Sequence, residues 1–223
     1  MDWYPLFLSF KLALISSLIL LLIGIPLAYL LSFRRFRFAS VLEALIALPM
    51  VLPPTVLGFY FIVLFSPNSM LGQFLDEHLG FSLVFSFPGL VFGSVLYSLP
   101  FMVQPIQNGF SQLPSDMLNF ARVLGRSDLD IFKRIILPNT LPALITGFVL
   151  SFAHTLGEFG LVIMIGGNIP EETKVASIAI FEAVELLRFE EAALYSGVLL
   201  GVSFLILLLV YSLGFRKNQP LRW

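Results

Sequence analysis

Residues 114–138 of the chain read PSDMLNFARVLGRSDLDIFKRIILP, a charged segment that lies between two strongly apolar stretches. Ser115 can cap the start of a helix, with Asp116 in the first turn, where a carboxylate suits the positive helix end. Leu118 and Ala121 then recur at helical spacing. The segment therefore predicts a short amphipathic helix at its start.

A glycine and a second cap follow this first helix. Gly125 can adopt the left-handed conformation that commonly ends a helix. Ser127, with Asp130 three residues later, is typical of a capping box that opens another helix. The segment thus predicts a helix, a glycine bend and a second helix, each too short to be stable alone in water. Such a hairpin must pack against a partner protein or against lipid headgroups, and these residues alone favour neither.

The rest of the chain is too apolar for a soluble domain. Of its 223 residues 58% are hydrophobic and only 12% are charged, whereas a soluble domain is about half apolar and a quarter charged. The formal net charge of -1 leaves no basic surface for nucleic acid. The chain has no cysteine, which excludes a disulfide scaffold and a zinc–thiolate site. We therefore expect an integral membrane protein.

Five stretches are long and apolar enough to cross a bilayer as helices, which takes about 20 residues. They are residues 12–33, 44–65, 83–108, 135–157 with a continuation at 159–165, and 192–215. Backbone polar groups cannot stay unpaired in lipid, and the runs lack the alternation of a transmembrane barrel. We expect an all-α membrane protein with about five transmembrane helices, and a single domain over residues 1–223.

Prolines fall inside or beside several of these spans. Pro49, Pro53 and Pro54 lie within one and a half turns of each other in the second span. Each proline removes a backbone donor and bends or breaks its helix. Prolines are also common in membrane helices generally, but this cluster favours broken helices beside a polar pathway.

The basic residues indicate an orientation. Ten of the 13 lysines and arginines lie in three segments that share one side of the membrane if the spans alternate. They are Arg34, Arg35, Arg37, Arg122, Arg126, Lys133, Arg134, Arg216, Lys217 and Arg222. The positive-inside rule then places the N-terminus outside, and the C-terminus and segment 114–138 in the cytoplasm. Residues 176–191 predict a short helix on the outer face, which either receives a partner protein or is a plain solvated cap.

The spacing within segment 114–138 resembles the cytoplasmic loop signature of ABC importer permeases. That signature runs Glu-Ala-Ala, three residues, Gly, nine residues, Ile, one residue, Leu, Pro. The matching residues are Ala121, Gly125, Ile135, Leu137 and Pro138. The chain departs at the start, where Asn119 replaces Glu and Phe120 replaces the first Ala.

This resemblance implies the type I, MetI-like permease fold, in which the loop forms coupling helices that sit in a groove of a cytoplasmic ATPase subunit. Segment 114–138 is then the coupling loop. The residues implied for it are Asp116, Asn119, Phe120, Ala121, Gly125, Asp128, Phe132, Ile135, Leu137 and Pro138.

Two further stretches narrow the resemblance. Residues 48–58, LPMVLPPTVLG, look like the proline-rich second span of molybdate permeases. Residues 152–160, FAHTLGEFG, resemble their fourth span, and residues 168–174 resemble the outer loop that follows. Sulfate and tungstate permeases share parts of these stretches. The resemblance implies an inner-membrane permease of a bacterial molybdate importer, with tungstate or sulfate as the alternative substrate.

Polar residues near the span ends are candidates for a pathway or gate. Glu158 is either such a residue or an acid at the outer interface that bonds to backbone. His154, one turn earlier, is expected to contact Glu158 as a structural pair. Thr55, Ser151 and Thr155 either offer hydroxyls to a passing oxyanion or serve helix packing.

The resemblance also implies an assembly. Five spans form half a pathway, so the partners are a second copy of the chain, a dimer of ATPase subunits, an oxyanion-binding protein outside and the membrane lipid, with no nucleic acid. No G-x4-G-K-[ST] phosphate loop is present, so ATP hydrolysis is assigned to the ATPase subunit. We expect no catalytic residue, cofactor or metal in this chain.

Two other classes of function remain as alternatives. A secondary transporter driven by ions needs intramembrane acids to bind the coupling ion, and only Glu158 offers itself. An intramembrane enzyme needs a motif such as G-x-S-x-G or H-E-x-x-H, and neither is present.

Overall fold

The computed structural model describes residues 2–34 and 36–215, and within that part of the chain the secondary structure is entirely helical. The elements are α1 (Tyr4–Phe33), α2 (Ala39–Val51), α3 (Pro54–Phe65), α4 (Met70–Leu79), α5 (Phe87–Ser111), α6 (Ser115–Val123), α7 (Asp128–Ile131), the π-helix η1 (Phe132–Ile136), α8 (Leu137–Asn139), α9 (Leu141–Leu156), α10 (Gly160–Gly166), α11 (Ala176–Glu185) and α12 (Phe189–Phe215). Four of the basic residues used to predict the orientation lie outside the described residues: Arg35, Arg216, Lys217 and Arg222.

Three helices of the described chain are long and apolar enough to cross a membrane without a break, namely α1, α5 and α12. Two bent pairs complete the set. The pair α2 and α3 is bent by 112°, and the pair formed by Asp128–Asn139 and α9 is bent by 69°. Counted with each bent pair as one span, the structure has five spans, and the prediction of an all-α membrane protein is confirmed.

Proline chemistry explains the break between α2 and α3. Leu52 and Pro53 are extended, with ψ of 138° and 136°, and the new helix begins at Pro54. A proline has no backbone N–H to give to the preceding turn, but it is well suited to the first position of a helix. The predicted interruption of the second span is therefore confirmed.

Several predicted boundaries are wrong. The first span begins at Tyr4 and not at residue 12, because the apolar helix continues through Lys11, whose ammonium lies 4.6 Å above the Phe87 ring. The helix expected over residues 176–191 ends at Glu185. Leu187 then takes a left-handed φ of 58°, which separates α11 from α12.

A helix that the sequence analysis did not predict lies between the second and third spans. α4 is capped at its start by Ser69, whose hydroxyl accepts from the Gly72 N–H at 2.9 Å. It ends at Gly80, which has a left-handed φ of 67°. Both caps are ordinary sequence signals.

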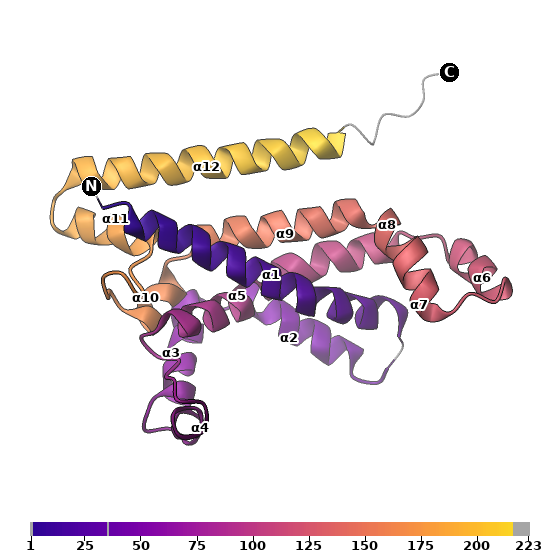
Figure 1. The fold of residues 1–223 in the computed structure, drawn as a ribbon, viewed down its shortest axis with the longest axis horizontal. Coiled ribbons are helices and arrows are strands. Elements are labelled where there is room, and N and C mark those ends of the chain that lie inside the picture. The colour runs from indigo at the N-terminus through magenta and orange to yellow at the C-terminus, as the bar shows by residue number, and fades with distance from the viewer. Residues whose placement is uncertain (1, 35, 216–223) are drawn as a thin grey trace.

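The core consists of α1, α5 and α9, which pack against one another along their lengths (Figure 1). α1 and α9 both approach α5 closely at Met102. A Cβ added to Gly24 of α1 would lie 2.7 Å from the Met102 Cγ, and one added to Gly147 of α9 would lie 2.9 Å from the Met102 carbonyl oxygen. Small residues at helix contacts are typical of packing within membranes. α12 lies beside α9 and α11 and leaves most of its apolar surface uncovered.

The shorter helices gather at two opposite ends of this bundle (Figure 1). One end carries α6 and α7 next to the end of α1, and we call it the basic end because it holds Arg34, Arg122, Arg126, Lys133 and Arg134. The other end carries α4, α10 and α11, and we call it the acidic end because Glu171, Glu172, Glu182 and Glu185 lie there.

Candidate functional site

The basic end is built from a helix, a glycine bend and a second helix. The first helix, α6, starts at Ser115 and carries Asp116 in its first turn, as expected. The predicted cap by Ser115 is wrong. Pro114 occupies the cap position, and its carbonyl oxygen accepts from the Met117 N–H at 3.2 Å. The fixed φ of proline sets the direction in which the chain enters this helix.

The predicted bend at Gly125 is confirmed. Gly125 has a φ of 75°, a left-handed conformation that glycine adopts without steric penalty. Its N–H donates to the Arg122 carbonyl at 2.9 Å, and the Arg126 N–H donates to the Ala121 carbonyl at 3.2 Å. These two bonds form a Schellman motif, which ends α6 and reverses the chain.

The second helix, α7, begins with the predicted cap. The Ser127 hydroxyl accepts from the Asp130 N–H at 3.2 Å. Asp128 lies 3.8 Å from both Arg34, at the end of α1, and Arg122, on α6. All three side chains are more than half exposed, so these pairs add little stability. Their effect is to orient the bend relative to the end of α1.

The residues expected in the coupling loop divide into two sets. Those packed against the bundle are Ala121, Phe132, Ile135 and Leu137. Those on the surface are Asp116, Asn119, Phe120, Gly125, Asp128 and Pro138. Ala121 is only 5% exposed and belongs to the core cluster of α5, so it holds α6 on the bundle and does not offer itself to a partner.

A set of apolar side chains on this hairpin has no cover within the described chain. Phe120, Val123, Leu124 and Leu129 are exposed by 66%, 83%, 64% and 61%. We call these four residues the loop patch. Three of them were not singled out as surface residues from the sequence, because their helical spacing predicts apolar positions without saying which face is buried.

The hairpin leads directly into α9. The chain passes through η1, in which the Leu137 N–H bonds to the Phe132 carbonyl, five residues back. Pro138 cannot donate a backbone hydrogen bond, which favours such an irregular turn. α7, η1 and α8 follow one another without interruption, and the chain then bends by 69° at Thr140, just before α9 begins.

A polar cluster joins α5 to the far end of α9. The Ser94 hydroxyl donates to the Glu158 Oε2 at 3.0 Å. The Ser98 Oγ lies 2.9 Å from both the His154 Nδ1 and the Thr155 Oγ1. The expected contact between His154 and Glu158 is thus replaced by two separate contacts, one to each serine of α5. The sequence places both serines among the hydroxyls within the spans, on one helix face by their spacing of four, but it does not predict these partners.

The four candidate pathway residues fall in different surroundings. Thr155 and Glu158 belong to this polar cluster and are 3% and 5% exposed. The Glu158 Oε1 is buried without a hydrogen-bond partner among the described residues. Ser151 is fully buried, and its Oγ also has no partner in that part of the chain. Thr55 lies on the surface at the start of α3, close to Gly160.

A cavity of about 410 Å³ adjoins the polar cluster where α9 ends and α10 begins. Its lining includes Pro54 at the start of α3, Tyr97 of α5, and His154, Glu158 and Gly160. The volume lies within the range of about 300–1,000 Å³ that small-molecule sites usually have. A polar cavity of this kind, among spans, is the first place to look for a solute site.

α11 is held to the bundle at the acidic end by one buried and one partly buried hydrogen bond. The Ala176 N–H donates to the Ser9 Oγ at 2.7 Å, and the Ser177 hydroxyl donates to the Glu158 carbonyl oxygen at 2.6 Å. Farther along the surface, Lys174 forms an ion pair with Glu182. The hydrogen-bonded Lys174 ammonium lowers the pKa of the Glu182 carboxyl.

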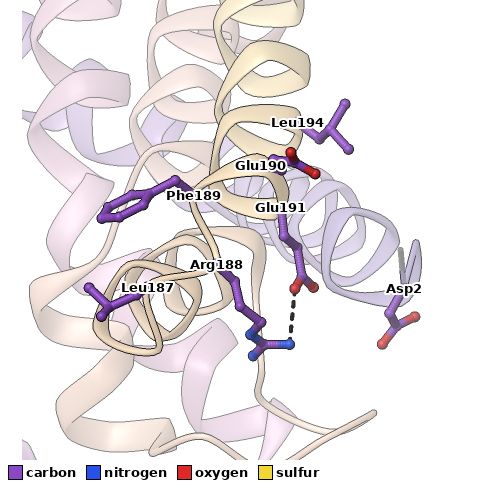
Figure 2. Close-up of a pocket in the computed structure, with 7 residues that line it drawn as sticks. All are labelled: Asp2, Leu187, Arg188, Phe189, Glu190, Glu191 and Leu194. Atoms are coloured by element: carbon purple, nitrogen blue, oxygen red, sulfur yellow. Dashed lines mark ion pairs between the residues drawn. The ribbon is translucent and has the colours of Figure 1, made fainter.

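The turn between α11 and α12 borders a surface pocket of about 740 Å³. Figure 2 shows Arg188 directed toward Glu191, with Asp2 beside them. The Arg188 Nη1 lies 2.9 Å from the Glu191 Oε2. Leu187 and Phe189 stay 73% and 61% exposed next to these charges. The acidic end thus presents a mixed polar and apolar surface at the turn between α11 and α12.

The family model and the related proteins that match this chain all describe membrane subunits of transport systems. Residues 20–220 match the model of the family described as "Binding-protein-dependent transport system inner membrane component". The molybdenum transport system permease protein ModB of Azotobacter vinelandii is 44% identical over 206 residues, which are 92% of this chain and 91% of that protein. The sulfate transport system permease protein CysT of Salmonella typhimurium is 34% identical over 207 residues, 93% of this chain and 74% of that protein.

Solved structures share the fold. A chain of the MetNI methionine ABC transporter, in an inward-facing conformation, superimposes with a TM-score of 0.74 at 15% identity, covering 96% of this chain and 95% of that chain. A chain of a bacterial alginate ABC transporter, in complex with a periplasmic protein bound to an alginate pentasaccharide, gives 0.75 at 17% identity, covering 97% and 79%. The expected MetI-like arrangement is confirmed at the level of the fold.

Proposed function

Since the chain belongs to the family of binding-protein-dependent transport system inner membrane components, we propose that it is the permease subunit of a bacterial molybdate importer of the ABC type. It is a multi-pass protein of the inner membrane, and it acts as a transport subunit and not as an enzyme. The assignment of molybdate as the substrate rests on one observation: the 44% identity with a molybdenum permease extends over nearly the whole of both chains.

In this proposal, segment 114–138 transmits the movement of the ATPase subunits to the membrane helices. The loop patch offers apolar side chains to a groove of a cytoplasmic ATPase subunit, while Ala121 holds α6 on the bundle. Closure of the ATPase dimer on ATP moves α6 and α7. Since α7, η1 and α8 lead to α9 across a single bend of 69°, the same movement shifts α9 and opens the pathway alternately to the two sides of the membrane.

The assembly follows from this role. Two copies of the chain form the pathway between them, related by a two-fold axis that gives two identical docking sites for two ATPase subunits. The basic end faces the cytoplasm, and the acidic end receives the oxyanion-binding protein near α11 and the pocket beside Arg188. Residues 1–223 act as one permease domain. Glu158, Thr155, Ser151 and Thr55 are its candidate pathway or gate residues.

Sulfate is the second candidate substrate, because the sulfate permease CysT is 34% identical over 93% of this chain. Tungstate is a further alternative, since it has the same charge and a similar tetrahedral shape to molybdate. An ion-coupled secondary transporter is much less consistent with the family.

The test is uptake by proteoliposomes that contain the chain, its ATPase and its binding protein. We expect ATP-dependent accumulation of molybdate, with unlabelled molybdate competing more strongly than sulfate and with tungstate as the third competitor. Omission of the ATPase should abolish uptake. Preference for sulfate would overturn the substrate, and uptake driven by an ion gradient without the ATPase would overturn the importer class.

A further inference from the structure

We propose that His154 is a substrate-contacting residue, which donates its Nε2–H to the oxyanion in the cavity at the break between α9 and α10. This inference rests on the proposed function and adds a specific contact to it. The sequence alone indicated only a structural role for this histidine. The relevant observations are the cavity, the hydrogen bonds on the opposite side of the ring, and the aromatic residues that hold the ring.

The contacts of the Ser98 hydroxyl favour one position for the proton of the His154 ring. The Ser98 hydroxyl touches both the His154 Nδ1 and the Thr155 hydroxyl, at 2.9 Å each. Only one arrangement gives both hydroxyl hydrogens an acceptor among these three groups: Thr155 donates to Ser98, and Ser98 donates to Nδ1. Buried polar groups are rarely left unsatisfied. Nδ1 is then the acceptor of a neutral imidazole, and Nε2 carries the hydrogen.

The Nε2–H side of the ring is the side available to a ligand. His154 lines the cavity of about 410 Å³, and the contact with Ser98 occupies its Nδ1, which leaves Nε2 as the ring nitrogen for a ligand. A donor that lines a cavity is suited to an anionic oxygen. The four oxygens of a tetrahedral oxyanion accept such bonds from any direction.

The ring is fixed before a ligand arrives. Phe101 stacks on it with the ring centroids 4.0 Å apart and the planes at 24°, and Tyr97 lies at 4.8 Å. Both aromatics belong to α5, as does Ser98. A donor held in this way loses little conformational entropy on binding.

The charges around the cavity are compatible with an anion in transit. Glu158 is the acid in its lining; the Ser94 hydroxyl donates to its Oε2, and its Oε1 is buried without a hydrogen-bond partner among the described residues. Beside this acid, the lining contains the imidazole of His154 and no lysine or arginine. A transport site must bind strongly enough to admit its substrate and weakly enough to release it, and a neutral N–H satisfies both conditions better than a fixed cation.

The experiment compares two substitutions in the complete complex with ATPase and binding protein. His154→Phe keeps an aromatic ring between Tyr97 and Phe101 but removes the N–H. His154→Gln gives up the ring but places an amide N–H at the position of Nε2. We expect ATP-dependent molybdate uptake to fall about tenfold or more in His154→Phe, as befits one lost hydrogen bond to a charged ligand, and to stay within about threefold of wild type in His154→Gln.

The outcomes separate this inference from the proposed function. Wild-type uptake tests the proposed function by itself. If the wild type transports molybdate and His154→Phe does so equally well, only the contact at His154 is wrong. Equal loss in both variants would assign a packing role to the ring and would also overturn the inference. Ser98→Ala removes the hydroxyl that donates to Nδ1, so the ring proton is no longer held on Nε2. We expect uptake to fall several-fold, and full uptake in that variant would contradict the proposed hydrogen bond from Ser98 to Nδ1.

Discussion

The Ser177 hydroxyl donates a 2.6 Å hydrogen bond to the backbone carbonyl oxygen of Glu158, and this bond joins α11 to the break between α9 and α10. The carbonyl lies at a helix end, where backbone groups lack partners within the helix. α11 is thereby tied to a residue that lines the cavity at the break between α9 and α10. The contact offers a route by which a protein bound at the acidic end can act on the pathway.

Ser177→Ala should weaken this connection. The loss of a partner for a buried carbonyl group costs about 1–3 kcal/mol, so we expect the stimulation of ATP hydrolysis by the binding protein to fall several-fold, with the basal rate retained. Ser111→Ala is the control, because the Ser111 hydroxyl bonds only to the Asn108 carbonyl within its own helix region. Unchanged stimulation in Ser177→Ala would show that α11 does not transmit the signal.

Gly125→Val should uncouple transport from ATP hydrolysis. A left-handed conformation costs a non-glycine residue about 1–2 kcal/mol, and more for a β-branched side chain, so the bend between α6 and α7 is expected to rearrange. We expect uptake to fall at least fivefold, with the protein still inserted in the membrane. The measurement is uptake per ATP hydrolysed in proteoliposomes.

Gly80 provides a matched control for that substitution. It ends α4 with a φ of 67°, and, as at Gly125, no atom lies within 4 Å of an added Cβ. Gly80→Val therefore carries the same local strain at the acidic end. If both valine variants lose uptake equally, general destabilisation explains the effect, and the bend has no special role.

Phe120→Asp should prevent the complex with the ATPase from forming. Phe120 is 66% exposed, so a carboxylate there leaves the fold of the chain intact but is costly in an apolar groove. We expect co-purification of the ATPase to fall at least tenfold. Met70→Asp, at an 89% exposed position of α4, is the control and should retain the ATPase. Retention of the ATPase by Phe120→Asp would argue against the loop patch as the docking surface.

The ion pair between Lys174 and Glu182 predicts a pH dependence of stability. Because Lys174 lowers the pKa of the folded-state Glu182, the pair stabilises the fold at neutral pH, and this contribution is lost as the pH falls through the lowered pKa, below the usual value of about 4.3. Lys174→Met should lower the Tm at pH 7 by about 2–4 °C or less, as expected for about 1 kcal/mol. The difference from wild type should shrink when thermal unfolding is measured near pH 4, and a difference that grows would contradict this assignment.

Much of the fold could be predicted because local signals and the bilayer act on the chain independently of its tertiary contacts. Apolar length marked the spans, and the cluster of prolines marked the break before Pro54. The bend at Gly125 and the cap at Ser127 followed from backbone chemistry at single residues. Ser115 does not cap α6 because Pro114 occupies the cap position, and its fixed φ sets the direction of the chain there.

The candidate site was harder to predict, because it depends on which side chains meet across helices. Helical spacing placed His154 next to Glu158, but contacts to Ser94 and Ser98 of α5 separate the two. Ala121 matched the loop signature as a docking residue, yet it packs on the bundle. In both cases the sequence predicts the helix that carries the residue. The contacts that its side chain makes depend on how that helix packs against α5.

The central claim, that segment 114–138 is gripped by an ATPase, can be tested by crosslinking because the chain contains no cysteine. Val123→Cys introduces a single thiol at an 83% exposed position of the loop patch, and Met70→Cys does so on α4 as a control. With a short bifunctional reagent in native membranes, we predict a product between Val123→Cys and the ATPase subunit that changes in yield when ATP is added, and none from Met70→Cys. Capture of phospholipid alone by Val123→Cys would contradict the account.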